Sequence, residues 1–232
     1  MNKLNHVGII MDGNRRWAKQ NKFQSVLFGH EAGSKKLIDV CKWCKKYGVK
    51  YITVYAFSTE NWGRSDYEVS GLFELMKRFF KNELSHCISE GINIIVSGNR
   101  TMLDSQIVQL IEDVEAATSE CNNVFLNIGI SYGGRDEIIR AMRGCINEIA
   151  SGVITMDDIS EDMFSKYLDT RGRPDIDLVI RTGGNHRLSG FFTWQTVYSE
   201  IFFTDVLWPA FTEKMFCEAI EYYDSVQINK GK

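Results

Sequence analysis

The sequence lacks the features that mark a membrane, secreted or linker-rich protein. Only two of its 232 residues are proline, Pro174 and Pro209, and no repeat or low-complexity segment divides the chain. No run of 18 apolar residues occurs, so the sequence offers no transmembrane span. The apolar stretch near the N-terminus is short and interrupted by polar residues, unlike that of a signal peptide. We therefore expect a cytoplasmic protein.

An excess of positive charge is also missing. The formal net charge is -3, which excludes the basic character of a typical nucleic-acid-binding domain. Any anionic ligand must therefore be bound by a local cluster of Arg and Lys. The six cysteines are expected to be free thiols. Cys41 and Cys44 form one C-x-x-C pair without the two further ligands of a zinc site, so we interpret them as packing residues of a helix.

Short apolar segments alternate with longer amphipathic ones. This alternation predicts an α/β fold with an open, mostly parallel six-stranded sheet and helices on both faces. We expect residues 1–232 to form a single domain. The expected strands are His6–Met11, Tyr51–Phe57, Ile92–Ser97, Val124–Ser131, Asp177–Arg181 and Ile201–Thr204. The expected helices are His30–Tyr47, Glu68–Leu84, Ser105–Ser119, Asp136–Ile149 and Thr212–Val226.

A first polar cluster, residues 12–17, comes directly after the first predicted strand. Gly13 allows a ligand to approach the backbone closely, and a helix that begins there favours an anion at its N-terminus. Asp12 has the same sign of charge as a phosphate, so a cation such as Mg²⁺ is needed between the two. Arg16 adds a charge-assisted contact. The alternative is an ordinary Asp-Gly turn without function.

Two more polar clusters follow the strands that end at Phe57 and Arg181. Residues 57–64 place hydroxyl, carboxylate, amide and guanidinium groups in a loop, a common position for functional side chains; the alternative is a helix start capped by Ser or Thr. Residues 181–189 place two arginines around a Gly-Gly turn, which suits phosphate binding; the alternative is a pair of surface arginines. Ligands bind at the carboxyl ends of parallel strands, so we expect one composite site.

Taken together, these segments resemble the cis-prenyltransferase family of isoprenyl transferases, which includes undecaprenyl diphosphate synthase. The similarity extends over almost the whole chain, with several motifs in the same order. These motifs are HVGIIMDGNRRWA (His6–Ala18), FGHEAG (Phe28–Gly33), YAFSTENWGR (Tyr55–Arg64), YGGR (Tyr132–Arg135), DLVIRTGG (Asp177–Gly184), HRLS (His186–Ser189) and YSEIFFTDVLWP (Tyr198–Pro209).

The resemblance implies a role for each matching residue. Asp12 would bind Mg²⁺ and assist the departure of the allylic diphosphate, and Asn61 would be the second catalytic residue. Glu200 would be a further metal ligand. Gly13, Asn14, Arg15 and Arg16 would bind the allylic diphosphate, with Trp17 and His30 beside it; Ser58, Thr59 and Glu60 would line the reacting centre, supported by Trp62 and Arg64; and Arg181, Arg187, Leu188 and Ser189 would hold the second diphosphate.

The same resemblance implies the reaction and the partners. Isopentenyl diphosphate would be joined to an allylic diphosphate with Mg²⁺ as cofactor, giving a product with a new Z double bond. The growing chain would lie in an apolar tunnel beside the helix Glu68–Leu84, where Gly71 would leave room. A homodimer is implied, with Glu200 and the following FFTDVLWP stretch near the subunit interface. The lipid product suggests peripheral contact with a membrane, and no nucleic acid is implied.

Five positions depart from the family pattern. Val26 and Asn229 stand where the family usually has Arg, so two cations that bind phosphate are missing; Lys22 is a nearby candidate to replace the first. Asn185 replaces a Glu, whereas Gly190 and Ser131 replace Asn. These departures leave the fold expectation intact. They keep open a short-chain or irregular, branched coupling, and a non-catalytic partner subunit. A phosphate-handling hydrolase is disfavoured, because no activated nucleophile or two-metal carboxylate cluster is apparent.

Overall fold

The computed structural model describes residues 4–226 and builds them around one parallel sheet. The strand order is β3-β4-β2-β1-β5-β6, and every neighbouring pair is parallel. All six predicted strands are present, and the predicted α/β class is confirmed. The strands are β1 (His6–Ile10), β2 (Tyr51–Ser58), β3 (Ile92–Ser97), β4 (Val124–Tyr132), β5 (Leu178–Arg181) and β6 (Glu200–Phe203).

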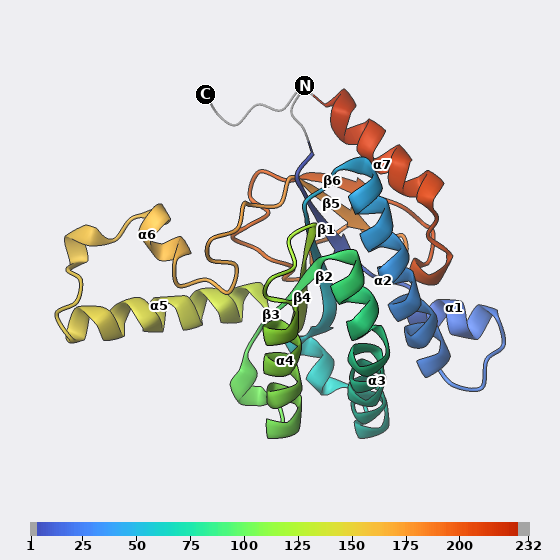
Figure 1. The fold of residues 1–232 in the computed structure, drawn as a ribbon, viewed down its shortest axis with the longest axis horizontal. Coiled ribbons are helices and arrows are strands. Elements are labelled where there is room, and N and C mark those ends of the chain that lie inside the picture. Colours follow the sequence, from blue (N-terminus) through green and yellow to red (C-terminus); the bar gives the residue numbers. More distant parts are fainter. Residues whose placement is uncertain (1–3, 227–232) are drawn as a thin grey trace.

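Between residues 4 and 226, seven α-helices connect and flank these strands (Figure 1). They are α1 (Asn14–Gln20), α2 (Leu27–Tyr47), α3 (Asp66–Glu90), α4 (Ser105–Thr118), α5 (Gly134–Ala150), α6 (Glu161–Ser165) and α7 (Glu213–Ser225). Short 3-10 helices occur at η1 (Thr59–Gly63), η2 (Arg100–Met102), η3 (Met156–Asp158) and η4 (Trp208–Ala210).

The predicted helices are confirmed, but the structure extends the one that matters most for the site. Helix α3 begins two residues before Glu68, because the Ser65 side chain caps it by accepting a hydrogen bond from the Glu68 backbone N–H. It continues past Leu84 to Gly91, where a left-handed glycine with φ 71° ends it. The last two turns of α3 contain mostly polar residues, so the periodicity of apolar residues does not predict them. The short helix α6 was missed for the same reason.

The two faces of the sheet are covered differently. On one face, alternate strand residues such as Val7, Ile9 and Val54 belong to a large apolar core shared with α2, α3, α4 and α7. On the other face, Ile10, Val179 and their neighbours form a smaller core. There the cover comes largely from the irregular segment 188–196, which contributes the fully buried Phe191 and Phe192.

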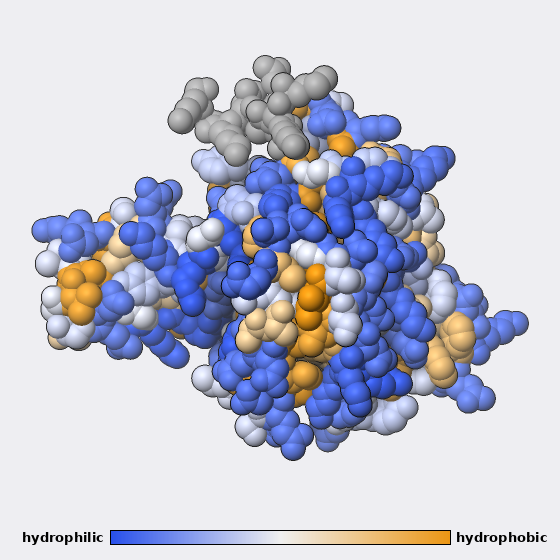
Figure 2. Space-filling model, viewed as in Figure 1, coloured by the Kyte–Doolittle hydropathy of each residue, from blue (hydrophilic) through white to orange (hydrophobic). Residues whose placement is uncertain are grey.

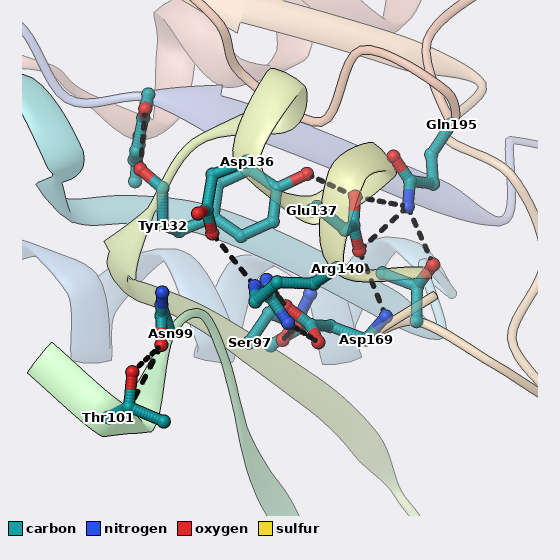
Figure 3. A network of polar contacts seen from close by, with 12 residues as sticks. Ser97, Asn99, Thr101, Tyr132, Asp136, Glu137, Arg140, Asp169 and Gln195 are labelled. Atoms are coloured by element: carbon teal, nitrogen blue, oxygen red, sulfur yellow. Dashed lines mark hydrogen bonds and ion pairs between the residues drawn. The ribbon is translucent and has the colours of Figure 1, made fainter. Parts of the chain in front are cut away.

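A buried carboxylate holds this irregular segment to helix α5 (Figure 3). The Tyr132 hydroxyl donates to Glu137 Oε2 at 2.5 Å, and Gln195 Nε2 donates to the same oxygen at 3.1 Å. The Asp169 backbone N–H donates to Glu137 Oε1 at 2.9 Å. Burial raises the pKa of Glu137. Three separate chain segments therefore meet at one side chain, which fixes the loop that follows β5.

The cysteine interpretation agrees with the structure. Cys41 and Cys44 are buried in the core on helix α2, and burial raises the pKa of both thiols. Within residues 4–226, no group of three or more His, Cys, Asp or Glu side chains is arranged to hold a metal ion. No helix in that range is long and apolar enough to cross a membrane.

A row of hydrogen-bonded polar side chains crosses the sheet on the same face as the smaller core. His6 Nδ1 donates to the Pro174 carbonyl at 2.9 Å, and the Thr53 hydroxyl lies 2.8 Å from His6 Nε2. The Asn127 side chain continues the row to Ser97, whose hydroxyl donates to Asn127 Oδ1 at 2.8 Å. A neutral imidazole satisfies both neighbours of His6, and burial lowers the pKa of this histidine to about 4.

The lowered pKa of His6 predicts a stability loss in mild acid. The unfolded chain takes up a proton below about pH 6.5, whereas the folded chain resists it until about pH 4. The contribution of His6 to the free energy of unfolding is complete above pH 6.5. It falls by on the order of 3 kcal/mol as the pH drops to 4. We expect His6→Gln to flatten the pH dependence of the unfolding free energy in that window, measured by urea denaturation. The exposed-site control His186→Gln should keep the wild-type slope; equal slopes for both variants would contradict this account.

Candidate active site

The three polar clusters meet at the carboxyl ends of β1, β2 and β5. These strands are adjacent in the order β2-β1-β5, so their following loops lie side by side. A cavity of about 430 Å³ lies between the loops. Its lining is Ile10, Met11, Asp12, Tyr55, Ser58, Glu60, Asn61, Arg64, Arg181 and Ser189. The expectation of one composite site is met.

Asp12 is held in place by donors from two other segments. Its Oδ2 accepts hydrogen bonds from Arg181 Nη2 at 3.0 Å and from Asn185 Nδ2 at 2.7 Å. In the described part of the chain, its Oδ1 has only a longer contact, 3.4 Å, with Arg16 Nη2. Burial alone would raise the pKa of Asp12, but the hydrogen bonds from Asn185 and Arg181 lower it below its usual value. The group is therefore an oriented carboxylate with one oxygen left for a ligand.

Arg181 is the buried cation of the site. It is 4% exposed, and its Nη1 donates to Ser189 Oγ at 2.9 Å and to the backbone carbonyl of Arg187. The side chain of Arg187 is exposed and does not line the cavity. The structure thus brings Arg181 and Ser189 to Asp12, and uses Arg187 there through its backbone.

A second cavity of about 340 Å³ adjoins the first at Asp12 and is strongly cationic. Gly13 begins helix α1 with φ 107°, and an added Cβ there would lie 2.8 Å from the Leu207 side chain, so only glycine fits. Lys19, which the sequence did not suggest, faces this cavity, whereas Lys22 does not. Its lining is Met11, Asp12, Gly13, Asn14, Arg15, Arg16, Lys19, His30 and Arg64.

A third, apolar cavity of about 180 Å³ begins beside the same residues. Asn14, His30 and Arg64 line both it and the cationic cavity. Helix α3 supplies its wall, as predicted, through Leu72, Leu75, Met76, Phe79 and Phe80. The expectation for Gly71 is wrong: an added Cβ at that position would lie 2.6 Å from Leu27 Cδ1, so Gly71 packs against Leu27 and is not among the residues that line the cavity.

Residues 57–64, the second polar cluster, include a helix cap and also contribute side chains to the cavities. Ser58 begins η1, and its backbone N–H donates to Asn61 Oδ1 at 3.1 Å, so the capped-helix alternative is also correct. Thr59 packs against Gly133, away from the cavities. Trp62 donates from Nε1 to Ser131 Oγ at 2.9 Å and stacks on Phe73. Glu60, Asn61 and Arg64 remain at the cavity.

Glu68 is a functional candidate that the sequence reading missed. It is 6% exposed, and its Oε1 accepts from Arg64 Nη1 at 2.9 Å. The same oxygen lies 3.6 Å from Arg15 Nε and 3.9 Å from His30 Nε2. One carboxylate thus joins α1, α2 and α3 around the cationic cavity. The i, i+4 spacing of Arg64 and Glu68 was the only available signal, and it is common on ordinary helix surfaces.

His30 is neutral at this junction. Burial, with the nearby Arg64 and Arg15, lowers its pKa to about 4. Its Nε2 and the Asn14 Oδ1 are buried and have no hydrogen-bond partner among residues 4–226. Because both residues line two of the cavities, these polar atoms are placed to meet a ligand.

Three further residues that were expected at the site lie elsewhere. Trp17 stacks on Phe23 with ring centroids 5.5 Å apart, and it lines none of the three cavities. Glu200 is the first residue of β6 and pairs with Leu178, at the opposite end of the sheet from Asp12. Within one chain the structure does not bring Glu200 to Asp12. Leu188 packs against the smaller core instead of lining the cavity.

Comparison with known proteins decides the family. Residues 10–231 match the family model described as "Putative undecaprenyl diphosphate synthase". The chain belongs to this cis-prenyltransferase family. The isoprenyl transferase of Aquifex aeolicus is 41% identical over 98% of this chain and 95% of that relative. The tritrans,polycis-undecaprenyl-diphosphate synthase (geranylgeranyl-diphosphate specific) of Pyrococcus furiosus is 40% identical over 98% and 86%.

A solved cis-prenyltransferase relative has nearly the same fold. The crystal structure of lavandulyl diphosphate synthase from Lavandula x intermedia, in complex with dimethylallyl diphosphate, has a TM-score of 0.95. It is 30% identical in sequence, and the alignment covers 99% of both chains.

The structure accounts for several departures from the cis-prenyltransferase pattern. Asn185 donates to Asp12, which a Glu could do only when protonated. Gly190 has φ 75° and Ser131 φ 50°, a backbone region that Asn also tolerates. Val26 is the residue directly before helix α2 and lines none of the three cavities. Asn229 lies outside the described residues.

Replacing Glu68 tests its role in this family site. Glu68→Gln keeps the shape but removes the charge that Arg64 and Arg15 share, so both guanidiniums should lose their fixed positions. We expect kcat/KM for the allylic substrate to fall by about tenfold to a hundredfold, mainly through KM. The control Glu74→Gln changes an exposed carboxylate on the same helix and should behave as wild type. An unchanged KM for Glu68→Gln would show that the junction does not position the cations.

Proposed function

We propose that the chain condenses isopentenyl diphosphate with an allylic diphosphate to form Z-prenyl diphosphates. The observation that carries the proposal is the meeting of three cavities at Met11 and Arg64: two polar ones that share Asp12 and are rich in guanidinium groups, and one apolar one. Two diphosphates need two cationic pockets, and a hydrocarbon chain needs an apolar one. A non-catalytic subunit would have no need for an oriented Asp12.

The donor set fits Mg²⁺ that is shared with a substrate. Mg²⁺ is typically bound by one or two carboxylates together with substrate phosphates and water. Asp12 offers one carboxylate whose side chain is 28% exposed and whose Oδ1 lacks a close partner. When bound there, Mg²⁺ would supply positive charge that stabilises the leaving diphosphate.

The chain's own residues account for the remaining work. Arg15, Arg16 and Lys19 surround the leaving diphosphate and stabilise its developing charge. Arg181 and Ser189 hold the isopentenyl diphosphate in the adjoining cavity. The C–O bond of the allylic substrate breaks, the alkene forms the new C–C bond, and loss of a proton creates the Z double bond. Asn14 and His30, between the cavities, orient the diphosphate end against the apolar end.

Asp12→Ala tests the catalytic assignment. We expect turnover to fall by on the order of a hundredfold or more, because a principal electrostatic contributor is lost, and a chelator should abolish turnover of the wild type. Circular dichroism serves as the folding control. A folded, fully active Asp12→Ala protein would exclude the mechanism.

The apolar cavity favours a short product. Its volume of about 180 Å³ is below the range of roughly 300–1,000 Å³ that is typical of ligand pockets. The fold similarity to a lavandulyl diphosphate synthase keeps irregular, branched coupling as the second candidate. Both candidates use the same two polar cavities and differ in the bond that forms.

Product analysis separates these candidates. Incubation with isopentenyl diphosphate, Mg²⁺ and allylic primers of several lengths, followed by mass spectrometry, should give products only a few isoprene units long. Nuclear magnetic resonance of the product then distinguishes linear from branched coupling. Phe79→Ala should lengthen the product, since Phe79 lines the apolar cavity. The same product distribution from Phe79→Ala and wild type would mean that this cavity does not limit chain length.

A homodimer is part of the proposal, with the α5–α6 arm as its contact. Helix α5 and the following residues project from the body (Figure 1), and apolar side chains gather on this arm (Figure 2). Ile139, Met142, Ile146, Val153 and Met156 are all exposed there. Such a surface is typical of an interface. Within the FFTDVLWP stretch, Trp208 is fully buried in its own chain and is therefore not available for a subunit contact.

Ile146→Lys tests this arrangement. Ile146 is 53% exposed, so the substitution costs the monomer little. A buried unpaired charge at an interface costs several kcal/mol, so we expect the variant to be monomeric by light scattering at micromolar concentration. The control Ile88→Lys, on the exposed surface of α3, should remain dimeric. A monomeric wild type, or a dimeric Ile146→Lys protein, would refute the proposed interface. The cytoplasmic location stays a prediction.

A further inference from the structure

Residues 14–28, which comprise α1, the turn after it and the first two residues of α2, are together called the α1–α2 turn. This segment has an unusual charge for the chain. Residues 14–28 contain Arg15, Arg16, Lys19 and Lys22 and no Asp or Glu, whereas the whole chain has a net charge of -3. Arg15 and Arg16 have acidic neighbours at 3.6 and 3.4 Å. Lys19 and Lys22 have no ion pair with any residue in the described part of the chain. The turn is therefore a local basic surface on an acidic protein.

The same turn exposes a stack of three aromatic rings. Trp17 and Phe23 lie 5.5 Å apart between centroids, and Phe23 and Phe28 lie 5.3 Å apart, with interplanar angles of 25° and 26°. Phe23 is 44% exposed and Phe28 47%. Figure 2 shows apolar side chains on the surface in this region, next to α1, surrounded by hydrophilic ones.

The backbone holds these rings outward. Lys22 adopts φ 57°, which reverses the chain after α1, and the Phe23 backbone N–H donates to the Ala18 carbonyl at 3.0 Å. Within residues 4–226, the rings are stacked on one another instead of being inserted into either apolar core. Apolar area that a fold keeps exposed in a fixed conformation is typical of a contact surface.

We propose that this turn is the surface through which the protein binds the interface of a membrane containing anionic lipids. Aromatic rings favour the level of the lipid headgroups, and each Lys or Arg near an anionic surface adds about 1 kcal/mol of attraction. The turn has both exposed aromatic rings and positive charges, and it contains no Asp or Glu. The negative net charge of the chain disfavours nucleic acid as the partner.

The position of the turn connects this surface to the proposed function, on which this step rests. Arg15, Arg16 and Lys19 line the cationic cavity that would hold the allylic diphosphate. A bilayer seated on the aromatic stack would lie beside that cavity. A prenyl chain leaving the site would then have a short path into lipid.

Sedimentation of the full chain with sucrose-loaded vesicles tests the proposal. The wild type should bind vesicles of phosphatidylcholine with a minority of phosphatidylglycerol, bind pure phosphatidylcholine poorly, and lose binding in high salt. Phe23→Ser should weaken binding by about tenfold. Lys22→Asn removes one charge while keeping a residue that tolerates positive φ, and should weaken binding by about fivefold.

Matched controls on α3 separate this surface from general effects. Ile88→Ser removes an apolar side chain that is also 44% exposed, and Lys81→Asn removes an exposed charge. Both should bind as wild type. All four variants should keep their thermal stability within a few degrees and their turnover of a soluble short primer without vesicles.

Three outcomes would overturn the proposal. The wild type could fail to bind anionic vesicles, Phe23→Ser and Lys22→Asn could both bind as tightly as the wild type, or the α3 control variants could lose as much binding as the two turn variants. A change of oligomeric state in Phe23→Ser with vesicle binding intact would assign the stack to a second copy instead. The enzymatic proposal is separable, because vesicle binding is measured without substrate. An inactive protein that binds vesicles refutes only the enzymatic proposal.

Discussion

The pairing of Asp12 with Arg181 is the interaction on which the site depends. Arg181 is buried at the end of β5, and a buried guanidinium without a partner would be strongly destabilising. Asp12, at the end of the neighbouring strand β1, supplies that partner at 3.0 Å. The pair fixes the two loops against each other. It also leaves one carboxylate oxygen of Asp12 without a close partner among residues 4–226, so a stabilising contact and the proposed ligand site share the same side chain.

The surrounding structure keeps this pair in register. Arg181 is further held by Ser189 from the irregular segment after β5, and that segment is tied to α5 through Gln195 and Glu137. On the other side, Glu68 holds Arg64 and lies near Arg15, which shapes the cationic cavity. Two buried carboxylates, neither of which lines the cavities, therefore position the groups that do.

The sequence was sufficient for the fold and for the location of the site. Alternating strand and helix patterns imply a parallel sheet, and polar residues directly after strands must then collect at one edge. It was insufficient for the direction of individual side chains. Arg187 and Trp17 lie in the right segments but do not line the cavities. Glu200 directly precedes the predicted strand Ile201–Thr204 and begins β6 in the structure, yet the register with β5 places it at the far end, and register depends on tertiary pairing. Glu68 and Lys19 were missed because both resemble ordinary charges on a helix.

The central claim is that a cation must lie between Asp12 and the diphosphate. Calorimetric titration of inorganic diphosphate with and without Mg²⁺, into wild type and Asp12→Asn, tests it most directly. The account predicts that Mg²⁺ tightens diphosphate binding to the wild type by about tenfold or more, a coupling of at least 1.4 kcal/mol. Asp12→Asn should bind diphosphate alone more tightly than the wild type, since the repulsion is gone, and should lose most of the coupling. The same Mg²⁺ effect in both proteins would contradict the account.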